Sequence, residues 1–409
     1  MKKYVIIGNG TAAAACIEGI RSRDETGSIT VISEENRPVY CRPLISYFLE
    51  DKTDTGRMNY RSPDFYEKNG CRVLYGKKAV SIDAEKKTVT ADDGLSVPYD
   101  ALCVASGASP TVPPLAGLDS VGEKYFFTTL DDAEKLKKAV QQNTRVLIMG
   151  AGLIGLKCAE GLRALTPEIT VCNRSKQILS RIMDADAAGI VQRHMEKNGV
   201  RFLLGYSDLR FDGNSMTAQD VTVEFDVLVL ALGTAPNTAA FKAAGGEVNK
   251  GIIVNEKMET SLPGIYAAGD CCEGYDASSG QKKVLALMPN AYLQGHAAGV
   301  NMAGGDQVYD NAIPMNSIGF FGLHTMTAGA YDGEMYEERD GEKLKRLFAK
   351  DGRLCGFILV GFTERAGIYT ALIRDRTPLD SVNFEILKKT ATTAAFPGAV
   401  RRKKFGGVV

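Results

Sequence analysis

The sequence predicts an α/β protein with two Rossmann-like domains, the second inserted in the first, and a smaller α+β domain at the C-terminal end. Two glycine-rich turns lead to this prediction: Gly8-Asn9-Gly10-Thr11-Ala12-Ala13 follows the apolar run 4–7, and Gly150-Ala151-Gly152-Leu153-Ile154-Gly155 follows the apolar run 146–149. A later apolar run, 264–268, ends in Gly269-Asp270. A strand, a glycine turn and a helix in this order open a Rossmann-type unit.

Each turn has the chemistry of a phosphate-binding loop. The first glycine permits a tight turn, the second lets the backbone approach a pyrophosphate, and the third small residue lets the helix pack closely. These places are taken by Gly8, Gly10 and Ala13, and then by Gly150, Gly152 and Gly155. The helix N-terminus adds free N–H groups and a partial positive charge. Two turns predict two dinucleotides, a bound flavin and an exchanging nicotinamide, and hence an electron-transfer enzyme.

The first domain is predicted to begin with residues 1–112. A strand over 3–7 leads into the first turn, and a second strand over 29–32 ends at Ser33-Glu34-Glu35. A carboxylate there accepts hydrogen bonds from ribose hydroxyls, and we favour Glu34 over Glu35. The alternative is a solvated loop carboxylate. A buried strand over 101–105 ends in a segment that contains Gly107.

The second domain is predicted over 113–240. The chain enters it through Val112-Pro113-Pro114, forms a helix over 131–140, and then a βαβ unit that reaches a strand over 169–172. A strand over 227–231 is followed by glycine and proline, as the strand over 101–105 is. This weak internal repeat indicates two related folds, the second inserted in the first.

The chain is predicted to return to the first domain over 241–310 and to form the C-terminal domain over 311–409. In the returning part, Gln294-Gly295 precedes a predicted helix over 297–302. In the C-terminal domain, strands are predicted at 319–322, 346–349 and 356–361, and a helix at 366–374. The basic tail, 401–404, is expected to be a disordered end; the alternative is a docking site for an acidic electron carrier.

Composition gives no sign of nucleic-acid or membrane binding. The 409 residues have a formal net charge of +0, with 44% hydrophobic and 24% charged residues. No secretory signal or membrane-spanning run is evident, so a cytoplasmic protein is expected. The nine cysteines form no CxxC pair, and their spacing predicts neither a metal site nor a disulfide framework.

The order of these motifs resembles the FAD-dependent pyridine nucleotide-disulfide oxidoreductase superfamily over essentially the whole chain. Within it, Tyr40-Cys41-Arg42-Pro43-Leu44-Ile45 is similar to the Tyr-x-Arg-Pro-x-Leu segment of NADH:rubredoxin reductases, ferredoxin reductases and the flavin module of nitrite reductase. The resemblance implies an FAD domain split by an NAD(P) domain, with a C-terminal interface domain that covers the flavin and permits a homodimer.

The resemblance also implies roles for particular residues. Arg42 and Pro43 would lie along the isoalloxazine, Asp270 would bind the ribityl chain, and the helix after Gln294-Gly295 would point its N-terminus at the flavin. For Arg42 the alternative is a surface ion pair. The implied flavin site comprises Gly8, Gly10, Ala13, Glu34, Arg42, Pro43, Gly107, Gly269, Asp270 and Gln294.

Three departures from the family pattern bear on the chemistry. Only Cys41 stands where disulfide reductases carry a redox pair, so a dithiol relay is not expected. We interpret Cys41 as a local variant; the alternative is a redox thiol whose pKa Arg42 lowers. Lys157 replaces a family glutamate near the nicotinamide, and is expected either to pair with a carboxylate such as Glu160 or to approach the flavin.

The third departure concerns the choice of nicotinamide. Asn173-Arg174-Ser175 replaces the acidic residue that usually ends the second strand of an NAD domain. An acid there repels a 2′-phosphate, whereas Asn173 and Arg174 remove the repulsion and add a cation. We therefore favour NADPH over NADH.

The sequence thus predicts an FAD-dependent NAD(P)H oxidoreductase that passes electrons to an external acceptor, such as a rubredoxin, a ferredoxin or an iron–sulfur partner subunit. One alternative is a Cys41-dependent NAD(P)H oxidase or coenzyme A-disulfide reductase. Another is a flavin-bearing subunit of a larger complex without a nicotinamide site of its own. His194, His296 and His324 are expected to be structural.

Overall fold

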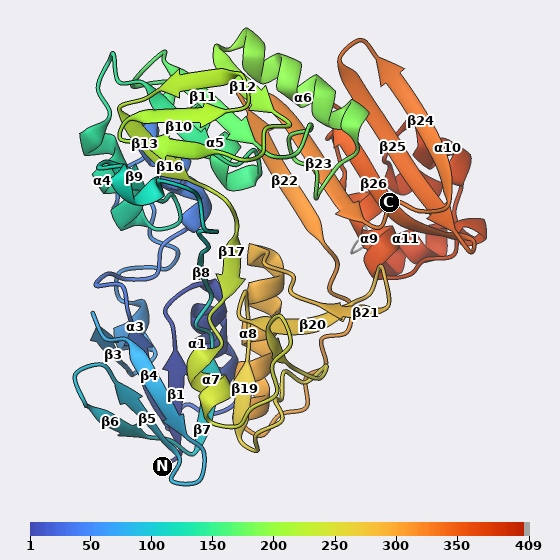
Figure 1. Ribbon diagram of the computed structural model, residues 1–409. Coiled ribbons are helices and arrows are strands. Elements are labelled where there is room, and N and C mark those ends of the chain that lie inside the picture. The colour runs from blue at the N-terminus through green and yellow to red at the C-terminus, as the bar shows by residue number, and fades with distance from the viewer. Residues whose placement is uncertain (405–409) are drawn as a thin grey trace.

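The computed structural model describes residues 1–404 and the side chains of residues 1–402. Two domains contain parallel sheets and a third contains an antiparallel sheet (Figure 1). The predicted α/β fold with an added α+β domain is confirmed. The boundaries after residues 112, 240 and 310 stay predictions.

The first domain is built on a five-stranded parallel sheet with the order β19-β7-β1-β2-β3. Its strands are β1 (Lys3–Ile7), β2 (Ser28–Ser33), β3 (Cys71–Tyr75), β7 (Ala101–Val104) and β19 (Ile265–Ala267). Strand β7 is apolar and buried at every position because it lies inside the sheet with both faces covered. Strand β19 follows the second domain in the chain and pairs with β7, so the chain returns to its first sheet.

Helices α1 (Thr11–Arg21) and α8 (Met288–Met302) pack against each other beside this sheet (Figure 1). They approach closely because glycines lie at the contact: a Cβ on Gly295 would lie 2.1 Å from the carbonyl oxygen of Ala12. The predicted helix start after Gln294-Gly295 is wrong, since α8 begins at Met288 and carries both residues in its middle. Gly295 serves helix packing and does not mark a turn.

The second domain has a five-stranded parallel sheet with the order β12-β11-β10-β16-β9. Its strands are β9 (Lys124–Tyr125), β10 (Val146–Met149), β11 (Ile169–Asn173), β12 (Val200–Leu204) and β16 (Val227–Leu230). Its helices are α4 (Leu130–Ala139), α5 (Leu153–Leu162) and α6 (Ala185–Lys197). Helix α4 begins at Leu130, one residue before the predicted start, because the Thr129 hydroxyl caps it by accepting a hydrogen bond from the Asp132 N–H at 3.1 Å.

Two short antiparallel strands, β8 (Ala108–Pro110) and β17 (Thr234–Pro236), carry the chain between the two domains. Asn237 ties them together: its N–H donates to the Gly107 carbonyl, and its side-chain amide donates to the Ser106 carbonyl, both at 2.9 Å. The two parallel-sheet domains are therefore joined by a paired, hydrogen-bonded crossing.

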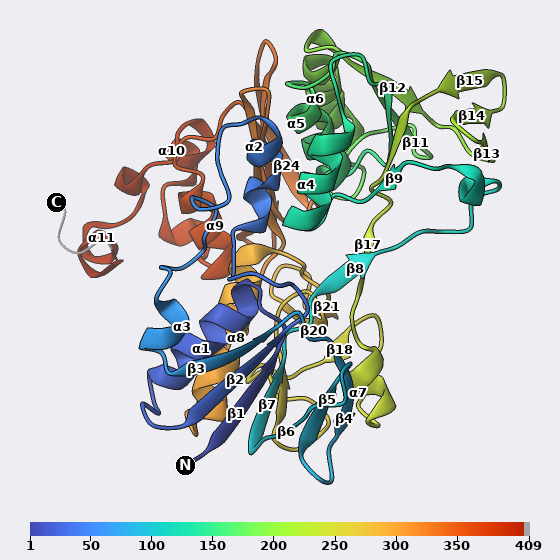
Figure 2. The ribbon, with the colours of Figure 1, turned by 90° about the vertical axis from the view of Figure 1, so that its left-hand side faces the viewer.

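A further segment of the first domain reaches into the second. It contains η1 (Arg42–Leu44) and α2 (Ile45–Leu49), and α2 stands beside α4 and α5, away from the first sheet (Figure 2). Ile45 and Leu49 are buried in the core of the second domain. This segment follows β2 of the first domain in the chain, but its helix α2 packs in the core of the second domain.

The remaining elements of these two domains are short. The first domain and its returning part contain α3 (Phe65–Lys68), β4 (Ala79–Asp83), β5 (Thr88–Ala91), β6 (Ser96–Pro98), α7 (Ala239–Ala243), β18 (Ile252–Ile253), β20 (Cys272–Asp276) and β21 (Gln281–Lys283). The second domain contains η2 (Leu118–Ser120), β13 (Arg210–Asp212), β14 (Ser215–Ala218) and β15 (Val221–Glu224).

The C-terminal domain has an antiparallel sheet with the order β22-β23-β26-β25-β24. The strands are β22 (Met315–Phe320), β23 (Leu323–Gly329), β24 (Glu334–Asp340), β25 (Lys343–Lys350) and β26 (Arg353–Val360). The helical elements are α9 (Gly367–Arg374), η3 (Leu379–Ser381), α10 (Phe384–Lys389), η4 (Thr393–Ala395) and α11 (Gly398–Lys404).

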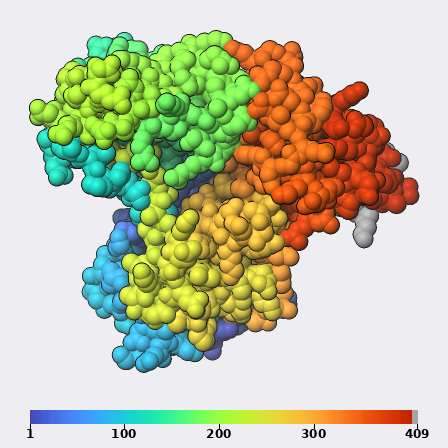
Figure 3. All heavy atoms as spheres, turned by 45° about the vertical axis from the view of Figure 1, so that its right-hand side comes forward, coloured from blue at the N-terminus to red at the C-terminus, as the bar shows by residue number. Residues whose placement is uncertain are grey.

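The two faces of this sheet bury different partners. Along β26, Phe357 and Leu359 join the core made with the domain's own helices, whereas Ile358 and Val360 join the core of the second domain. This alternation follows from the two-residue period of a strand. Figure 3 shows the second and C-terminal domains in direct contact, green against orange.

Helix α6 makes charged contacts with the C-terminal sheet. Arg346, on β25, has a side chain only 11% exposed, and it pairs with Asp184 and Asp186 at 2.7 Å and with Glu337 at 2.6 Å. Burial raises the pKa of Asp184, but the Ala187 amide and Arg346 outweigh it and leave the pKa below its ordinary value. Hydrogen bonds from Arg339 and Arg346 likewise lower the pKa of Asp186.

The basic tail is not a disordered end over the part that the structure describes. Helix α11 includes Arg401 and Arg402 and continues to Lys404, so the expectation for 401–404 is wrong for the backbone. The side chains of Lys403 and Lys404 lie outside the described residues. Within residues 1–404, no helix combines the length and apolar character that crossing a bilayer requires.

We expect Arg346→Met to lower the apparent Tm by about 3 °C near pH 7, because three carboxylates lose their partner. The lowered pKa values of Asp184 and Asp186 mean that their contribution is full above about pH 4 and is lost as the pH falls further. The difference between variant and wild type should therefore shrink near pH 3, as scanning calorimetry would show. Lys350→Met, which removes an exposed ion pair with Asp332, is the control. An equal difference at both pH values would contradict this account.

Candidate functional site

The first glycine turn has an open cradle at the start of α1. Gly8 has a φ of +103°, and a Cβ there would lie 2.1 Å from the Ala105 carbonyl oxygen. Gly10 is the N-cap of α1, and a Cβ there would meet nothing within 4 Å. No side chain caps the helix and no acidic residue lies in its first turn. The free N–H groups of this helix end therefore face open space.

The second turn repeats this geometry at the start of α5. Gly150 has a φ of +111°, and a Cβ there would lie 2.2 Å from the Ala231 carbonyl oxygen. A Cβ on Gly152, the N-cap, would again meet nothing within 4 Å. A Cβ on Gly155 would lie 2.0 Å from the Gly150 carbonyl oxygen, so glycine is required there for the helix to pack against the turn. Both cradles fit a pyrophosphate.

Asp270 follows β19 and has a carboxylate without a hydrogen-bond partner among the described residues. Burial raises its pKa, and the charge of Arg42 opposes that rise in part. Arg42 and Asp270 therefore interact electrostatically, although they are far apart in the sequence. A half-buried carboxylate with spare acceptor capacity fits the hydroxyls of a ribityl chain.

Gln294 holds the turn that carries Asp270. Its side-chain oxygen accepts from the Gly269 N–H at 2.9 Å, and the side chain is buried. Because Gln294 lies in the middle of α8, the helix N-terminus that the resemblance directs at the flavin is at Met288, not at Gln294. Gln294 acts on the site through the Gly269 main chain.

Arg42 takes part in a network at the border of the first and second domains. It forms an ion pair with Glu35 and donates to the Thr128 carbonyl at 3.0 Å and to the Tyr40 hydroxyl at 3.2 Å. The Tyr40 hydroxyl donates to Glu35 at 2.7 Å and accepts from the Leu130 N–H at 2.9 Å. The structure thus shows the alternative given for Arg42, an ion pair at the surface, and the Arg42 side chain is 46% exposed.

The two candidate ribose carboxylates have different surroundings. Glu35 is half-buried and paired with Arg42, whereas Glu34 is exposed and paired with Lys78 at 2.9 Å. The preference for Glu34 stays a prediction. Sequence reasoning missed that Glu35 is the carboxylate beside Arg42; their short separation along the chain was the available signal.

Cys41 does not have the environment of an activated thiol. Burial raises its pKa, and the Leu44 N–H only partly offsets this. The alternative of a pKa lowered by Arg42 differs from what the structure shows, where the guanidinium is engaged with Glu35, Tyr40 and Thr128. All nine cysteines are free thiols. Pro43, the next residue but one, is exposed at the start of η1.

Gly107 lies where the chain leaves the first sheet. It has a φ of +66°, and a Cβ there would meet nothing within 4 Å. Its carbonyl accepts from Asn237. Gly107 therefore leaves open space beside the first glycine turn, since Gly8 contacts the nearby Ala105 main chain.

Near the second turn, Asn173 is hydrogen-bonded to the main chain, whereas Arg174 is exposed. The Asn173 side-chain oxygen accepts from the Ala151 N–H at 3.4 Å, and its amide donates to the carbonyls of Ser175 and Gln177 at 3.3 Å. Asn173 thus shapes the glycine turn. Arg174 is exposed and has no hydrogen bond or ion pair with another described residue.

Lys157 pairs with Glu160, one of the two arrangements expected from the sequence. The Lys157 ammonium also donates to the Gly319 carbonyl at 3.3 Å and lies 5.1 Å from the centre of the Tyr47 ring. The structure therefore brings together a helix of the second domain, the tip of the C-terminal sheet and α2. The sequence predicted the ion pair with Glu160 but not the contacts of Lys157 with Gly319 and Tyr47.

Two of the three histidines make hydrogen bonds that hold the fold together, and the third is exposed. His194 donates to the Phe321 carbonyl, and His296 contacts Gln307. His324 is exposed on β23. No group of three or more His, Cys, Asp or Glu side chains within residues 1–404 is arranged to hold a metal.

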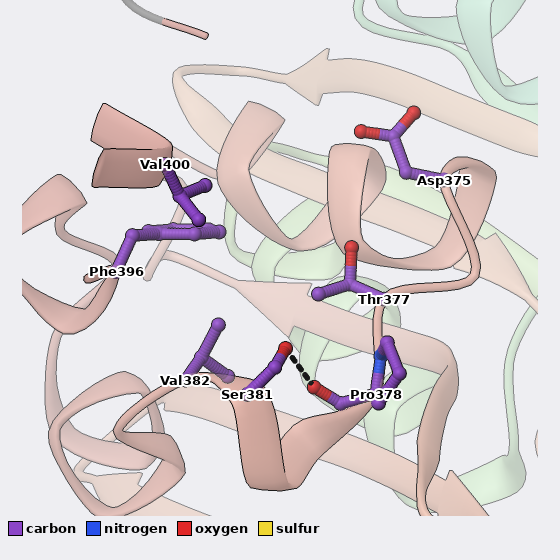
Figure 4. A pocket seen from close by; sticks show the side chains of 7 residues that line it. All are labelled: Asp375, Thr377, Pro378, Ser381, Val382, Phe396 and Val400. Atoms are coloured by element: carbon purple, nitrogen blue, oxygen red, sulfur yellow. Dashed lines mark hydrogen bonds between the residues drawn. The ribbon is translucent and has the colours of Figure 1, made fainter. Parts of the chain in front are cut away.

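A separate hollow lies in the C-terminal domain (Figure 4). Val382, Phe396 and Val400 line it, and Ser381 donates to the Pro378 carbonyl at 2.6 Å. None of the predicted site residues lines this hollow, so it is distinct from the two glycine turns.

The comparison with known families identifies the class of this protein. Residues 2–295 match the family described as pyridine nucleotide-disulphide oxidoreductase, and the chain belongs to that family. It is an FAD-dependent NAD(P)H oxidoreductase that passes electrons to an acceptor, as the sequence predicted.

Relatives similar in sequence support the assignment. The chain is 33% identical over 393 residues to the NADH-dependent phenylglyoxylate dehydrogenase subunit epsilon of Aromatoleum evansii, with 92% of both chains covered. It is 30% identical to the assimilatory nitrate reductase electron transfer subunit of Bacillus subtilis (strain 168), with 92% of this chain covered but only 50% of that protein.

Two solved structures share the fold. The covalent putidaredoxin reductase–putidaredoxin complex has a TM-score of 0.88 and 22% identity, covering 96% of this chain and 99% of the other. An engineered water-forming NADPH oxidase, a mutant of the Lactobacillus brevis enzyme, bound to NADPH, has a TM-score of 0.84 and 22% identity, covering 93% and 92%.

The first turn allows its two glycines to be distinguished. We expect Gly8→Ala to destabilise the protein by about 3 kcal/mol or more, because it combines a positive φ with a main-chain clash. Gly10→Ala should keep the wild-type Tm but bind FAD about tenfold more weakly, since its Cβ points into the open cradle. Thermal unfolding and the flavin-to-protein absorbance ratio measure the two effects.

Gly122→Ala is the matched control, because a Cβ there also meets nothing within 4 Å but lies outside the cradle. It should change neither the Tm nor the flavin content. Full flavin content in Gly10→Ala would contradict the assignment of this turn to the FAD pyrophosphate.

Proposed function

We propose that this protein passes electrons from NADPH, through FAD, singly to a redox protein of rubredoxin or ferredoxin type or to an iron–sulfur partner subunit. The observation that carries the proposal is the isolation of Cys41. Burial raises its pKa, and the next cysteine in the sequence, Cys71, belongs to strand β3, so the Cys41 segment carries no cysteine pair for a thiol relay.

The flavin would be held by the first glycine turn and by side chains on both sides of the domain border. The Gly8, Gly10 and Ala13 turn would bind the pyrophosphate with its free N–H groups. Asp270 would accept from the ribityl hydroxyls, and Arg42 and Pro43 would lie along the ring. The remaining residues proposed for this site are Glu34, Gly107, Gly269 and Gln294. Bound FAD accepts an electron pair and can release electrons one at a time.

The nicotinamide dinucleotide would bind at the second turn. Gly150, Gly152 and Gly155 leave the N-terminus of α5 free for its pyrophosphate. Asn173 fixes the shape of this turn through Ala151. Lys157, on the same helix, would set how α5 meets the C-terminal domain.

The preference for NADPH is supported by unpaired positive charge at the end of β11. Arg174 follows β11 directly, is exposed, and has no hydrogen bond or ion pair with another described residue. Guanidinium groups bind phosphates well. The engineered NADPH oxidase carries substitutions to Ala, Arg and Ser at three consecutive positions, and Asn173-Arg174-Ser175 has a similar composition. The relative from Aromatoleum evansii is NADH-dependent, so the ratio of catalytic efficiencies is the deciding measurement.

A redox-protein acceptor is supported by the putidaredoxin reductase complex, whose chain shares this fold with putidaredoxin attached. A second candidate is a flavin-bearing subunit of a larger enzyme. The similarity to a subunit epsilon over 92% of both chains favours it. In that form the partner subunit, and not a diffusing carrier, takes the electrons. A Cys41-dependent oxidase or coenzyme A-disulfide reductase remains the third candidate.

An anaerobic titration of the purified flavoprotein tests the proposed function. We expect NADPH to bleach the flavin absorption band, and Cys41→Ser to bleach at the wild-type rate and to reduce a one-electron dye as well as wild type. Reduction of peroxide or coenzyme A disulfide by the wild type that is lost in Cys41→Ser would support a thiol enzyme instead. Failure of both nicotinamides to bleach the wild-type flavin would overturn the nicotinamide route and favour the subunit that receives electrons from a partner.

The 2′-phosphate proposal is tested by Arg174→Glu. The substitution replaces an attracting cation with a repelling acid, so the NADPH-to-NADH ratio of kcat/KM should fall by about tenfold or more. Lys124→Glu, an exposed change in the same domain, is the charge-matched control and should leave the ratio unchanged. If wild type prefers NADH by about tenfold or more, the role given to Arg174 is wrong.

A further inference from the structure

The turn between β22 and β23 has an unusual main chain. Phe321 has a φ of 47°, and Gly322, which follows it, has a φ of 85°. A two-residue hairpin loop with two positive φ values favours Asn-Gly or Gly-Gly, because a side chain at the first position meets steric strain. An aromatic residue there persists only where its surroundings hold it.

Two helices of the second domain hold this residue by its main chain. The Phe321 N–H donates to Glu160, on α5, at 2.6 Å, and the Phe321 carbonyl accepts from His194, on α6, at 3.1 Å. The neighbouring Gly319 carbonyl accepts from Lys157 at 3.3 Å. The tip of the C-terminal sheet is thus fixed at three main-chain groups.

The charges that hold the tip are themselves buried. The side chain of Glu160 is 7% exposed and that of Lys157 is 14% exposed, and the two form an ion pair. Their polarity matches the tip, since the carboxylate faces an N–H and the ammonium faces a carbonyl. Removing one charge would leave the other buried without its partner, which is costly.

The tip also lies in a core shared by three parts of the chain. Phe320 is fully buried in the cluster that contains Ile45 and Leu49 of α2 and Leu156 of α5. The Lys157 ammonium lies over Tyr47 of the same α2. Helix α2 follows Arg42-Pro43 directly, so the expected flavin side, the second domain and the C-terminal domain meet here.

Helix α5 links this cluster to the second glycine turn. The helix begins at Leu153 after its N-cap Gly152; Lys157 lies in its middle and Glu160 near its C-terminal end. One rigid helix therefore carries free N–H groups at one end and the tip contacts further along. A shift of the tip contacts would move the helix end that is proposed to bind the nicotinamide.

We propose that Lys157, Glu160 and His194 are positioning residues that latch the β22–β23 turn to the second domain and so align the N-terminus of α5 with the flavin side of the molecule. The inference rests on the nicotinamide site proposed at α5. The latch acts on the rate of flavin reduction and not on the affinity for the nucleotide, because the free N–H groups of α5 are unchanged.

Glu160→Gln tests the latch. The amide oxygen can still accept from Phe321, but the buried Lys157 loses its countercharge. In anaerobic stopped-flow experiments with the FAD-loaded protein, the limiting rate of flavin reduction should fall about tenfold or more, with little change in the apparent Kd of the nucleotide. An unchanged limiting rate in the folded variant would overturn the proposal.

Two further variants separate the latch from a simple salt bridge. The double variant Lys157→Glu/Glu160→Lys keeps an ion pair but sets each charge against the wrong main-chain group, so it should be as slow as Glu160→Gln. Recovery of the wild-type rate by this swap would overturn the proposal. Lys197→Met removes an exposed pair with Glu342, also between α6 and the C-terminal domain, and should reduce flavin at the wild-type rate.

Hydrogen exchange provides a readout that needs no nucleotide. Exchange at the Phe321 amide should be faster in the charge swap than in wild type or Lys197→Met, because its acceptor is lost. If wild-type flavin is not reduced by either nicotinamide, the proposed function fails, yet this comparison still tests the latch. Equal exchange in the swap and in wild type would overturn it.

Discussion

The contact between a carbonyl group and the first glycine of each turn is the constraint on which the structure depends. The Ala105 carbonyl lies against Gly8, and the Ala231 carbonyl lies against Gly150, at distances that no side chain would permit. Both carbonyls stand three residues before the strands that cross between the domains, β8 and β17, which pair with each other. The two turns and the crossing are therefore parts of one arrangement. Because the main chain is packed so closely, the helix ends α1 and α5 are both left free of side chains.

The site at the border of the domains is assembled from main-chain and side-chain groups that belong to different parts of the fold. The segment with Arg42 leaves the first domain, and α2 packs into the core of the second. Arg42 is held by Glu35, which follows β2 of the first sheet, and by the Thr128 carbonyl before α4. Beside it, burial raises the pKa of the Cys41 thiol, and the neighbouring guanidinium is already engaged with other groups. An oxidoreductase of this kind relies on its flavin and an external acceptor.

Charge is distributed differently at the two faces of the second domain. Toward the C-terminal domain, Lys157 pairs with Glu160 on α5. At the start of α6, Asp184 pairs with Arg346, and Asp186 pairs with both Arg339 and Arg346. These pairs hold α5 and α6 in place. At the end of β11, by contrast, Arg174 stands exposed without a partner among the described residues. Paired charges fix the geometry of an interface, whereas an unpaired cation remains available to a phosphate. The same domain thus combines an attachment made of paired charges with an exposed cation at the end of β11.

The local parts of this protein were determined by the sequence itself. The strand over 3–7, both glycine turns and the return of the chain at 265 could be predicted, because each depends on residues adjacent in the chain: an apolar run, a glycine that tolerates a positive φ, and a small residue under a helix. The ion pair of Lys157 with Glu160 was accessible for the same reason, since residues three apart on a helix face each other. Tertiary structure decided what depends on distant segments. The sequence placed Gly295 before a helix, whereas it lies inside α8 and packs on α1. The sequence also left open whether Arg42 lowers the pKa of the Cys41 thiol, and the structure shows the guanidinium bound to other groups. The latch on Phe321 could not be predicted, because main-chain groups carry no signature in the sequence and their partners are chosen only when the domains pack together.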